Sequence, residues 1–340
     1  MVWTFRVSIL LVAVCAHASA ASPHLYTVAK SIPLGAPDRW DYLTFDPGSA
    51  RLYAAHAVQI DVIDTRNGSV IGKVPVDGAN GIALVPARGK GYAGSRAKKA
   101  VLVFDLESLA VMKTLPADED TDGAIYDPAS HRVFVVEGDP AAATVIDTDN
   151  DTVVKQLPLG GKPEFAVTDG AGHLYVNITD KHEIARIDTK ALAVDAHWPM
   201  PGCMSPRGLA FDVRQGRLFS TCGNARMIVL DSRDGQILST VPIGQGSDAA
   251  AFDPKRNLAF SSNGEGTISV VRENPGKGYE VADTVPTQPL ARTMTLDPGT
   301  GRLFSIAADT IGVAARSGAT SGRPRMRPGS VKLLILEPAG

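Results

Sequence analysis

The sequence predicts an all-β fold, a seven-bladed β-propeller with four antiparallel strands in each blade. First, a similar unit recurs seven times, with 39 to 44 residues between successive copies. Second, each copy contains four short apolar strands separated by turn residues, which is the pattern of a propeller blade. Third, no long segment shows the apolar periodicity of an amphipathic α-helix. Seven blades also explain how one domain can exceed the usual length of about 100 to 200 residues.

The first strand of each unit ends in a turn residue that marks the repeat. This position is aspartate in six copies and valine in one. Its members are Asp46, Val85, Asp127, Asp169, Asp212, Asp253 and Asp297. Aspartate suits a turn because its side chain accepts hydrogen bonds from nearby backbone amides. The second strand then carries a pair such as Leu52-Tyr53, and the third carries a pair such as Ile63-Asp64.

The two ends of the chain are expected to meet in blade seven. Residues 25–34 resemble the fourth strand of a unit, such as residues 69–76, but they precede the first copy. The seventh copy ends with its third strand, at 331–336. We therefore predict that the N-terminal strand completes blade seven and pairs an edge that would otherwise be open. The predicted domain spans residues 21–340, and a Gly/Pro/Arg-rich insertion in blade seven, at about 311–330, is expected to be flexible.

The first twenty residues have the features of a secretory signal peptide. Arg6 gives a positively charged start, residues 8–15 form an apolar stretch, and Ala18-Ser19-Ala20 suits cleavage after Ala20. The apolar stretch is shorter than the roughly 20 residues that a membrane-spanning helix needs. The sequence therefore predicts a periplasmic or secreted protein without a membrane span.

Charge and cysteine content narrow the possible functions. The formal net charge, 34 − 36 = −2, gives no general electrostatic argument for nucleic-acid binding. Cys203 and Cys222 remain after signal cleavage, and the propeller topology brings both to the same rim. In an oxidising compartment a disulfide between them is the preferred interpretation. A metal site that includes Met204 and a pair of free thiols are the alternatives.

A ring of polar residues is predicted at the mouth of the central channel. In a propeller, the loops that enter the first strands surround this mouth, so the residue five before each turn residue lies there. We call these seven residues the crown: Asp41, Asn80, Asp122, Glu164, Arg207, Asp248 and Arg292. Their neighbours in the sequence are otherwise Gly, Ala, Tyr, Phe or Thr. Either the crown lines a ligand pocket, or its members cap loops and pair across blades.

The ends of the second strands face the same way and supply three further candidates, His56, Glu137 and Asn263. Histidine can act as a base or a metal ligand near neutral pH. The acidic residues carry the oxygen ligands that divalent cations prefer. No local spacing such as His-x-His supports a metal site, however, and a lone histidine often has a structural role. A divalent cation is therefore possible but no cofactor is expected.

The repeat resembles the YVTN seven-bladed propeller repeat. The segments Trp40-Asp41-Tyr42-Leu43, 161–165 (GKPEF) and 248–254 (DAAAFDP) are similar to those of the exported, YncE-like branch of that family. The resemblance covers about residues 30–340. It implies the fold and, much less specifically, the function, because propellers include both binding modules and enzymes.

Three functions are compatible with these features. We expect a monomeric protein that binds a small ligand or a macromolecular partner at the crown, without catalysis, because the sequence lacks recognisable catalytic and haem-binding motifs. The first alternative is a metal-dependent periplasmic hydrolase or lyase, similar to lactonases. The second is weak binding of single-stranded DNA, which the resemblance suggests, through basic loops. Those loops contain Arg96, Lys98, Lys99, Arg316, Arg323, Arg325 and Arg327.

Overall fold

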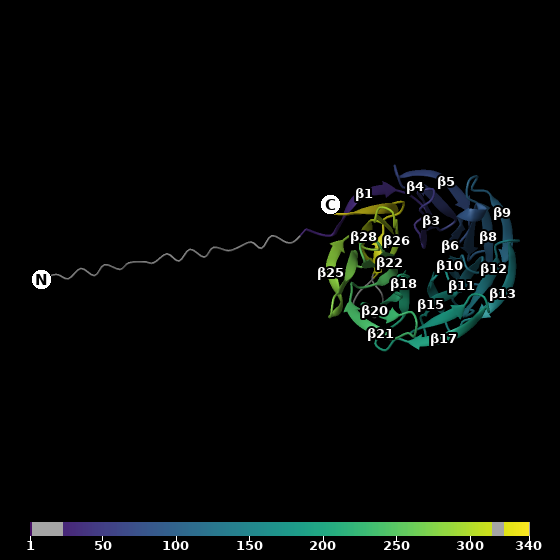
Figure 1. The fold of residues 1–340 in the computed structure, drawn as a ribbon. Helices are drawn as coiled ribbons and strands as arrows, with labels where there is room; N and C mark the ends of the chain where they lie inside the picture. Colours follow the sequence, from purple (N-terminus) through teal and green to yellow (C-terminus); the bar gives the residue numbers. More distant parts are fainter. Residues whose placement is uncertain (2–22, 315–322, 340) are drawn as a thin grey trace.

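Seven four-stranded antiparallel sheets form a closed ring in the computed structural model, which describes residue 1 and residues 23–314 and 323–339 (Figure 1). The predicted seven-bladed β-propeller is therefore confirmed. The described residues contain one short 3-10 helix, η1 (Pro86–Arg88), and no α-helix. None of their helices is long and apolar enough to cross a membrane. The predicted signal peptide lies almost entirely outside the described residues.

The strands of the first four blades follow the chain from the axis outward. Blade 1 contains β2 (Leu43–Asp46), β3 (Arg51–His56), β4 (Gln59–Asp64) and β5 (Ser69–Pro75). Blade 2 contains β6 (Ala79–Val85), β7 (Lys90–Ser95), β8 (Ala100–Asp105) and β9 (Val111–Pro116). Blade 3 contains β10 (Thr121–Asp127), β11 (Arg132–Glu137), β12 (Ala142–Asp147) and β13 (Thr152–Pro158). Blade 4 contains β14 (Pro163–Thr168), β15 (His173–Ile178), β16 (Glu183–Asp188) and β17 (Ala193–Pro199).

The remaining three blades follow the same order. Blade 5 contains β18 (Pro206–Asp212), β19 (Arg217–Cys222), β20 (Arg226–Asp231) and β21 (Ile237–Pro242). Blade 6 contains β22 (Ser247–Asp253), β23 (Leu258–Asn263), β24 (Thr267–Asn274) and β25 (Gly278–Pro286). Blade 7 contains β26 (Thr293–Leu296), β27 (Leu303–Ala307), β30 (Lys332–Pro338) and β1 (Tyr26–Pro33).

Blade 7 closes the ring as predicted. The N-terminal strand β1 pairs antiparallel with β30, in a register that runs from Tyr26 opposite Pro338 to Pro33 opposite Lys332. The sheet order is β1-β30-β27-β26, so the N-terminal strand is the outer strand of the last blade. The two ends of the chain are thereby hydrogen-bonded to each other, which pairs the edge of β30 that would otherwise be open.

The insertion in blade 7 contains regular structure that its composition did not reveal. Strands β28 (Thr310–Ala314) and β29 (Arg323–Met326) form an antiparallel hairpin between β27 and β30. Residues 315–322, which include the candidate residue Arg316, lie outside the described residues. The Gly/Pro/Arg-rich sequence has no alternating apolar pattern, which is why it predicted a loop rather than two strands.

The core lies between adjacent blades and contains the aromatic residues of the repeat. Tyr53 of blade 1 and Phe104 of blade 2 are fully buried, with ring centroids 6.1 Å apart. Phe219 of blade 5 and Phe252 of blade 6 stack at 5.4 Å. Such pairs contribute about 0.5–1.5 kcal/mol beyond the burial of their area. The recurring aromatic position therefore joins blade to blade and holds the ring rigid around the channel.

The innermost strands approach one another closely at the axis, and glycine permits this. A Cβ atom on Gly81 would lie 2.2 Å from the carbonyl oxygen of Asp122, and one on Gly208 would lie 2.5 Å from the carbonyl carbon of Ala249. Both glycines directly follow a crown residue in the sequence. The backbones of neighbouring blades therefore meet here, and the crown side chains just before them gather around the axis.

Candidate functional site

Six of the seven crown residues line one cavity of ≈ 590 Å³ at the mouth of the central channel. We call this cavity the crown pocket. Each residue lies at or just before the start of the innermost strand of its own blade, so successive members are about one repeat apart. The six are Asp41, Asp122, Glu164, Arg207, Asp248 and Arg292.

An aromatic pair forms the floor of the crown pocket. Tyr42 of blade 1 and Phe165 of blade 4 come from opposite parts of the ring, and their ring centroids are 4.7 Å apart. Both residues line the crown pocket and also a second cavity of ≈ 340 Å³. The pair therefore separates the charged mouth of the channel from the space below it.

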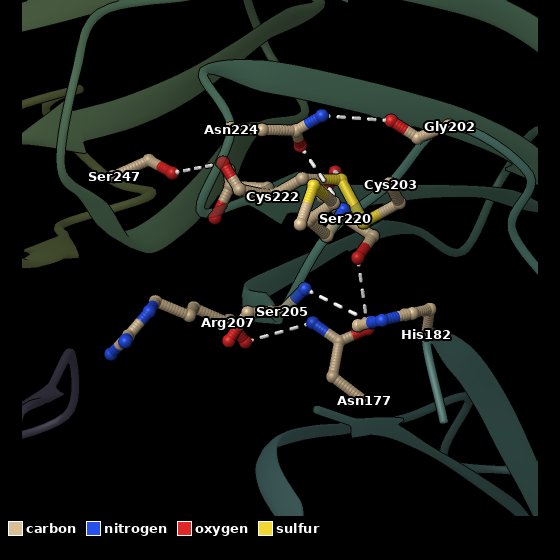
Figure 2. Close-up of a disulfide and its surroundings, with 12 residues drawn as sticks. Asn177, His182, Gly202, Cys203, Ser205, Arg207, Ser220, Cys222, Asn224 and Ser247 are labelled. Atoms are coloured by element: carbon tan, nitrogen blue, oxygen red, sulfur yellow. Dashed lines mark hydrogen bonds between the residues drawn. A yellow bond between two sulfur atoms is a disulfide. The ribbon is translucent and has the colours of Figure 1, made fainter. Parts of the chain in front are cut away.

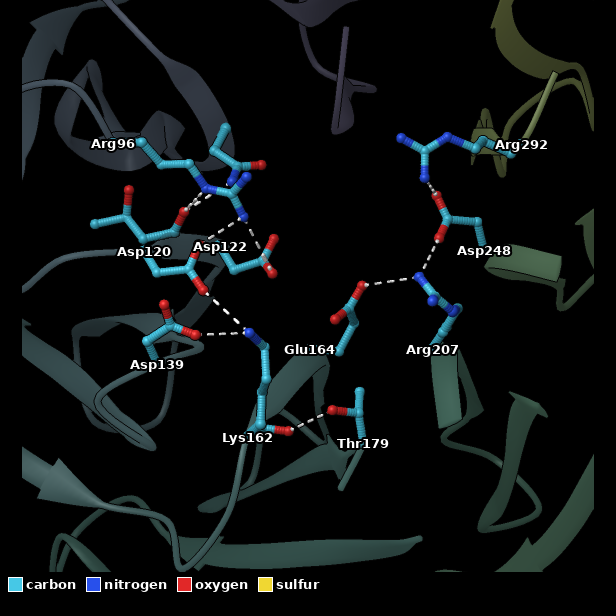
Figure 3. A network of polar contacts seen from close by, with 12 residues as sticks. Arg96, Asp120, Asp122, Asp139, Lys162, Glu164, Thr179, Arg207, Asp248 and Arg292 are labelled. Atoms are coloured by element: carbon cyan, nitrogen blue, oxygen red, sulfur yellow. Dashed lines mark hydrogen bonds and ion pairs between the residues drawn. The ribbon is translucent and has the colours of Figure 1, made fainter. Parts of the chain in front are cut away.

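One side of the crown pocket carries a chain of ion pairs between blades 4, 5, 6 and 7 (Figure 3). Asp248 accepts hydrogen bonds from Arg207 at 3.3 Å and from Arg292 at 2.9 Å. Glu164 lies 4.0 Å from the same Arg207, at the limit of an ion pair. Asp248 therefore pairs with both arginines, while Glu164 has a single, distant ion-pair partner in the described part of the chain, Arg207.

The facing side carries a second group of ion pairs, which also appears in Figure 3. Arg96 lies 3.1 Å from Asp120 and 3.6 Å from Asp122. Lys162 lies 2.8 Å from Asp139 and 3.4 Å from Asp120. Both cations on this side are therefore already paired with carboxylates.

Burial raises the pKa of three crown carboxyl groups. Desolvation, followed by repulsion from Asp41, raises the pKa of Asp122 to about 7. Desolvation and the charges of Asp122 and Asp248 raise the pKa of Glu164 to about 8. Desolvation likewise raises the pKa of Asp41, with Arg292 opposing the change. Groups that exchange protons near neutral pH and lie in a cleft are typical of functional sites.

Several polar groups at the crown pocket have no partner among the described residues, including the Trp40 indole N–H and the Tyr42 hydroxyl. Among the described residues, the Asp41 carboxylate makes no hydrogen bond or ion pair at the distances that define them. Thr293, on the pocket wall, is 4% exposed, and its hydroxyl has no hydrogen-bond partner. Burying such groups without partners costs free energy. A ligand or ordered water is the natural partner for them.

The structure does not bring the other four candidate residues to the crown pocket. Asn80 donates a hydrogen bond to the backbone oxygen of Thr121, at 2.7 Å, and so joins blade 2 to blade 3. Nδ1 of His56 lies 2.6 Å from Asp61, and its Nε2 lies 2.5 Å from the backbone oxygen of Pro37. Both ring nitrogens are therefore occupied by structural contacts.

Glu137 and Asn263 also have buried structural contacts. Glu137 accepts hydrogen bonds from the Asp118 amide at 2.8 Å and from Thr144 at 2.6 Å. Asn263 donates to Thr267 and Ser269, at 3.0 and 3.1 Å. The second strands lie one position farther from the axis than the first, so these side chains are buried inside the blades.

Sequence reasoning did not assign several residues of the pocket. Tyr42 and Phe165 occupy the position directly after the crown residue, which is Gly, Ala or Thr in the other blades. Two aromatic residues at a position that is otherwise small are a signal that could have predicted the floor. Lys162 and Arg39 also line the pocket, but they stand in loops, outside the positions of the repeat that were compared.

A metal centre has no support from the side chains that the structure describes. Within residues 23–314 and 323–339, no group of three or more His, Cys, Asp or Glu side chains could hold a metal ion. The crown carboxylates belong to different blades, and arginine side chains stand between several of them. The possible divalent cation therefore stays a prediction.

The predicted disulfide is confirmed beside the crown pocket. Cys203 and Cys222 are bonded, with an S–S distance of 2.10 Å and Cα atoms 5.4 Å apart (Figure 2). The bond joins the loop that enters blade 5 to the end of that blade's second strand. Asn224 adds a hydrogen bond to the backbone oxygen of Gly202, at 2.9 Å. The loop leads directly to Arg207, so the disulfide holds the chain that carries one wall of the pocket.

The fold and the site define a β-propeller with a closed-floor pocket at its channel mouth. No protein-family model matches the chain, and no curated protein matches it in sequence. Solved structures match in fold. Hydrazine synthase of Kuenenia stuttgartiensis is 14% identical, with a TM-score of 0.70, over 78% of this chain and 91% of that chain.

Two further structures extend over more of this chain. U3-55K is 11% identical with a TM-score of 0.73, and the match covers 92% of this chain and 99% of that chain. The WD40 repeats of RRP9 are 10% identical with a TM-score of 0.73, covering 92% of this chain and 98% of that chain. At these identities the likeness shows the propeller fold alone.

Proposed function

We propose that this protein is an exported, YVTN/YncE-like propeller that binds a small charged ligand in the crown pocket. The observation that carries the proposal is a cavity of ≈ 590 Å³ with charged walls from six blades and the Tyr42–Phe165 floor. This volume lies within the range of about 300–1,000 Å³ that is usual for small-molecule sites. The concave shape favours a small ligand over a macromolecular partner.

Export is supported by the disulfide and by the composition of residues 1–20. Disulfides persist in oxidising compartments such as the bacterial periplasm and are rare in reducing ones. The bond between Cys203 and Cys222 is buried and closes the loop that leads to Arg207. Cleavage after Ala20 is tested by mass spectrometry of the protein recovered from the periplasm.

The binding proposal is tested with a panel of small cationic, anionic and zwitterionic compounds in a thermal-shift assay. A ligand at 100 times its dissociation constant stabilises the folded state by about 2.7 kcal/mol. We expect at least one compound to raise the Tm of the wild type but not that of Asp122→Asn combined with Glu164→Gln. The matched control is Glu280→Gln, which removes an exposed carboxylate paired with Arg272 on the outer part of blade 6. Equal Tm shifts in all three proteins would show that the compound binds outside the pocket.

A hydrolase or lyase is the second candidate, and the pKa values of Asp122 and Glu164 favour it. Carboxyl groups with a pKa of about 7 and about 8 can give and take protons at neutral pH. Acid–base catalysis by these two carboxyl groups needs no metal ion. Turnover of lactones or esters that falls at least about 100-fold in Asp122→Asn would favour the enzyme over the binding protein.

Binding of single-stranded DNA has no specific observation in its favour. Arg96 is paired with Asp120 and Asp122, and Lys99 lies 2.8 Å from Glu119. These carboxylates offset the positive charge that would attract phosphates. We therefore do not propose it as the function.

A further inference from the structure

The charges of the crown pocket are unevenly satisfied, and this indicates the charge of its ligand. Arg207 and Arg292 both bind Asp248, at 3.3 and 2.9 Å. Across the pocket, Arg96 and Lys162 also have carboxylate partners. These four cations are therefore already paired, and a fifth cation of the lining, Arg39, has no ion-pair partner among the described residues.

The carboxylates are in the opposite situation. Asp41 has no ion-pair partner among the described residues, and Glu164 has only Arg207 at 4.0 Å, which lies closer to Asp248. Asp122 has Arg96 at 3.6 Å, and Arg96 lies closer to Asp120. Among the residues described, three carboxylates of the lining are therefore poorly paired, against one unpaired cation, Arg39, and a cation is the ligand that would offset them.

The floor and wall favour an organic cation over a metal ion. Tyr42 and Phe165 pack against each other and line the same cavity as the carboxylates. An ammonium group is attracted both to carboxylates and to aromatic faces. The Thr293 hydroxyl, 4% exposed and without a partner, supplies a further polar group at the wall. As stated above, no group of side chains in the described part of the chain could hold a metal ion.

A second cavity extends from the crown pocket and is less polar. Its volume is ≈ 590 Å³, and it shares five residues with the pocket, Arg39, Trp40, Arg207, Asp248 and Arg292. We call it the hairpin groove, because Met326 of strand β29 lines it. The other residues that we use to define it are Pro324, Leu290, Gly246 and Gly264.

The hairpin groove has a bare backbone on one side and apolar side chains on the other. Gly246 has a φ of +68°, a conformation that favours glycine, and its oxygen accepts a hydrogen bond from the Gly264 amide at 2.9 Å. Met326 and Leu290 are partly buried against the core of blades 7 and 1. A flat alkyl or aryl group fits between these two surfaces. Of the charged residues that line the groove, all but Asp38 also line the crown pocket.

We infer that the ligand of the crown pocket is an organic ammonium compound with an apolar body. Its ammonium group lies among Asp41, Asp122 and Glu164 above the aromatic floor, and its body lies in the hairpin groove. This inference rests on the proposed function and names the ligand class of the same site. It also gives the blade 7 hairpin a role, because β29 supplies one wall of the groove.

Binding of a cation should release protons. Asp122 and Glu164 have pKa values of about 7 and about 8, so both are partly protonated at neutral pH in the free protein. A bound ammonium group favours their charged forms and lowers both pKa values. Affinity should therefore rise from pH 6 to pH 9, before the amine itself loses its proton near a pKa of about 10.

Calorimetric titration with four related probes tests the inference. The probes are 2-phenylethylamine, methylamine, 2-phenylethanol and 3-phenylpropionate, measured at pH 8. We expect 2-phenylethylamine to bind at least about tenfold more tightly than each of the others, since one lost interaction of 1.4 kcal/mol corresponds to tenfold. Glu164→Gln and Asp41→Asn should each weaken it about tenfold or more, while Glu280→Gln leaves it unchanged. Met326→Ser should weaken 2-phenylethylamine but leave methylamine unchanged.

The outcomes separate this inference from the proposed function. Tightest binding of 3-phenylpropionate or 2-phenylethanol, lost in the double variant Asp122→Asn with Glu164→Gln, would overturn the ammonium ligand and retain the pocket as a binding site. Binding of 2-phenylethylamine that is equal in all variants would overturn the inference and remove the pocket from the function. Absence of heat with all four probes would overturn the inference, and the thermal-shift panel would then decide the proposed function alone.

Discussion

Glu164 and Glu137 are two glutamates on the same face of the propeller, and their surroundings differ. Glu164 belongs to the crown, next to the axis, and has one distant partner, Arg207 at 4.0 Å. Glu137 ends a second strand, is fully buried, and accepts hydrogen bonds from Asp118, Thr144 and Gln156. Burial raises the pKa of both. Residues nearest the axis are left for a ligand, whereas residues one strand farther out hold the blades together.

The disulfide joins the loop before the innermost strand of blade 5 to the end of that blade's second strand. Its removal should therefore have the largest effect on stability. It closes a separation of 19 residues between the loop before Arg207 and the end of β19. Cys203→Ser combined with Cys222→Ser should lower the free energy of unfolding by about 3 kcal/mol. Urea denaturation measures this value, with the reduced wild type as the control. A change below about 1 kcal/mol would show that the loop is held by its hydrogen bonds alone.

Alanine substitutions at the two glutamates test the contrast directly. Glu137→Ala leaves the buried Thr144 hydroxyl, the Asp118 amide and the Gln156 side chain without this acceptor, and should cost about 2 kcal/mol. Glu164→Ala should cost less than about 0.5 kcal/mol, since it removes a poorly paired carboxyl group that is largely protonated at this pH. Both values come from urea denaturation at pH 7. Equal losses would mean that the crown is as structural as the second-strand ends.

The pH dependence of stability gives a smaller effect with a defined sign. The folded-state pKa values of Asp122 and Glu164, about 7 and about 8, exceed the ordinary values of these groups, 3.8 and 4.5. The folded state therefore binds more protons between about pH 4.5 and pH 8, and stability falls as the pH rises through this window.

The corresponding measurement is the Tm at pH 5 and at pH 8. We expect the wild type to be more stable at pH 5, by about 1 kcal/mol, after allowance for solvent screening of groups that are partly exposed. Asp122→Asn combined with Glu164→Gln should reduce this difference, whereas Glu280→Gln should not. A wild type that is more stable at pH 8 would contradict the raised pKa values.

Much of the fold could be predicted because it is a local pattern that repeats. The seven turn residues, the strand pairs such as Leu52-Tyr53, and the unpaired third strand at 331–336 each follow from the sequence within one blade. The disulfide also followed, because the repeat places Cys203 and Cys222 at one rim. The hairpin β28–β29 did not, since its residues lack the alternation that marks the other strands.

The candidate site was predicted only in part, for a related reason. The position five before each turn residue identified six residues of the crown pocket, but the same reasoning included Asn80 and the second-strand ends. Whether a polar side chain near the mouth faces the channel or a blade depends on its distance from the axis and on its bonding partner, since Asn80 lies on an innermost strand and still bonds to blade 3. A periodic pattern along the strands does not contain that distance.

The sequence by itself determined the number of blades, the closure by the N-terminal strand and the residues that approach the axis. It could do so because strand period and turn chemistry are properties of neighbouring residues. Only the tertiary structure decided that Tyr42 and Phe165 meet across the channel and that Asp248 holds both Arg207 and Arg292. These contacts join residues one or more blades apart. Their geometry, and the unmatched carboxylates that result, depend on how the ring closes.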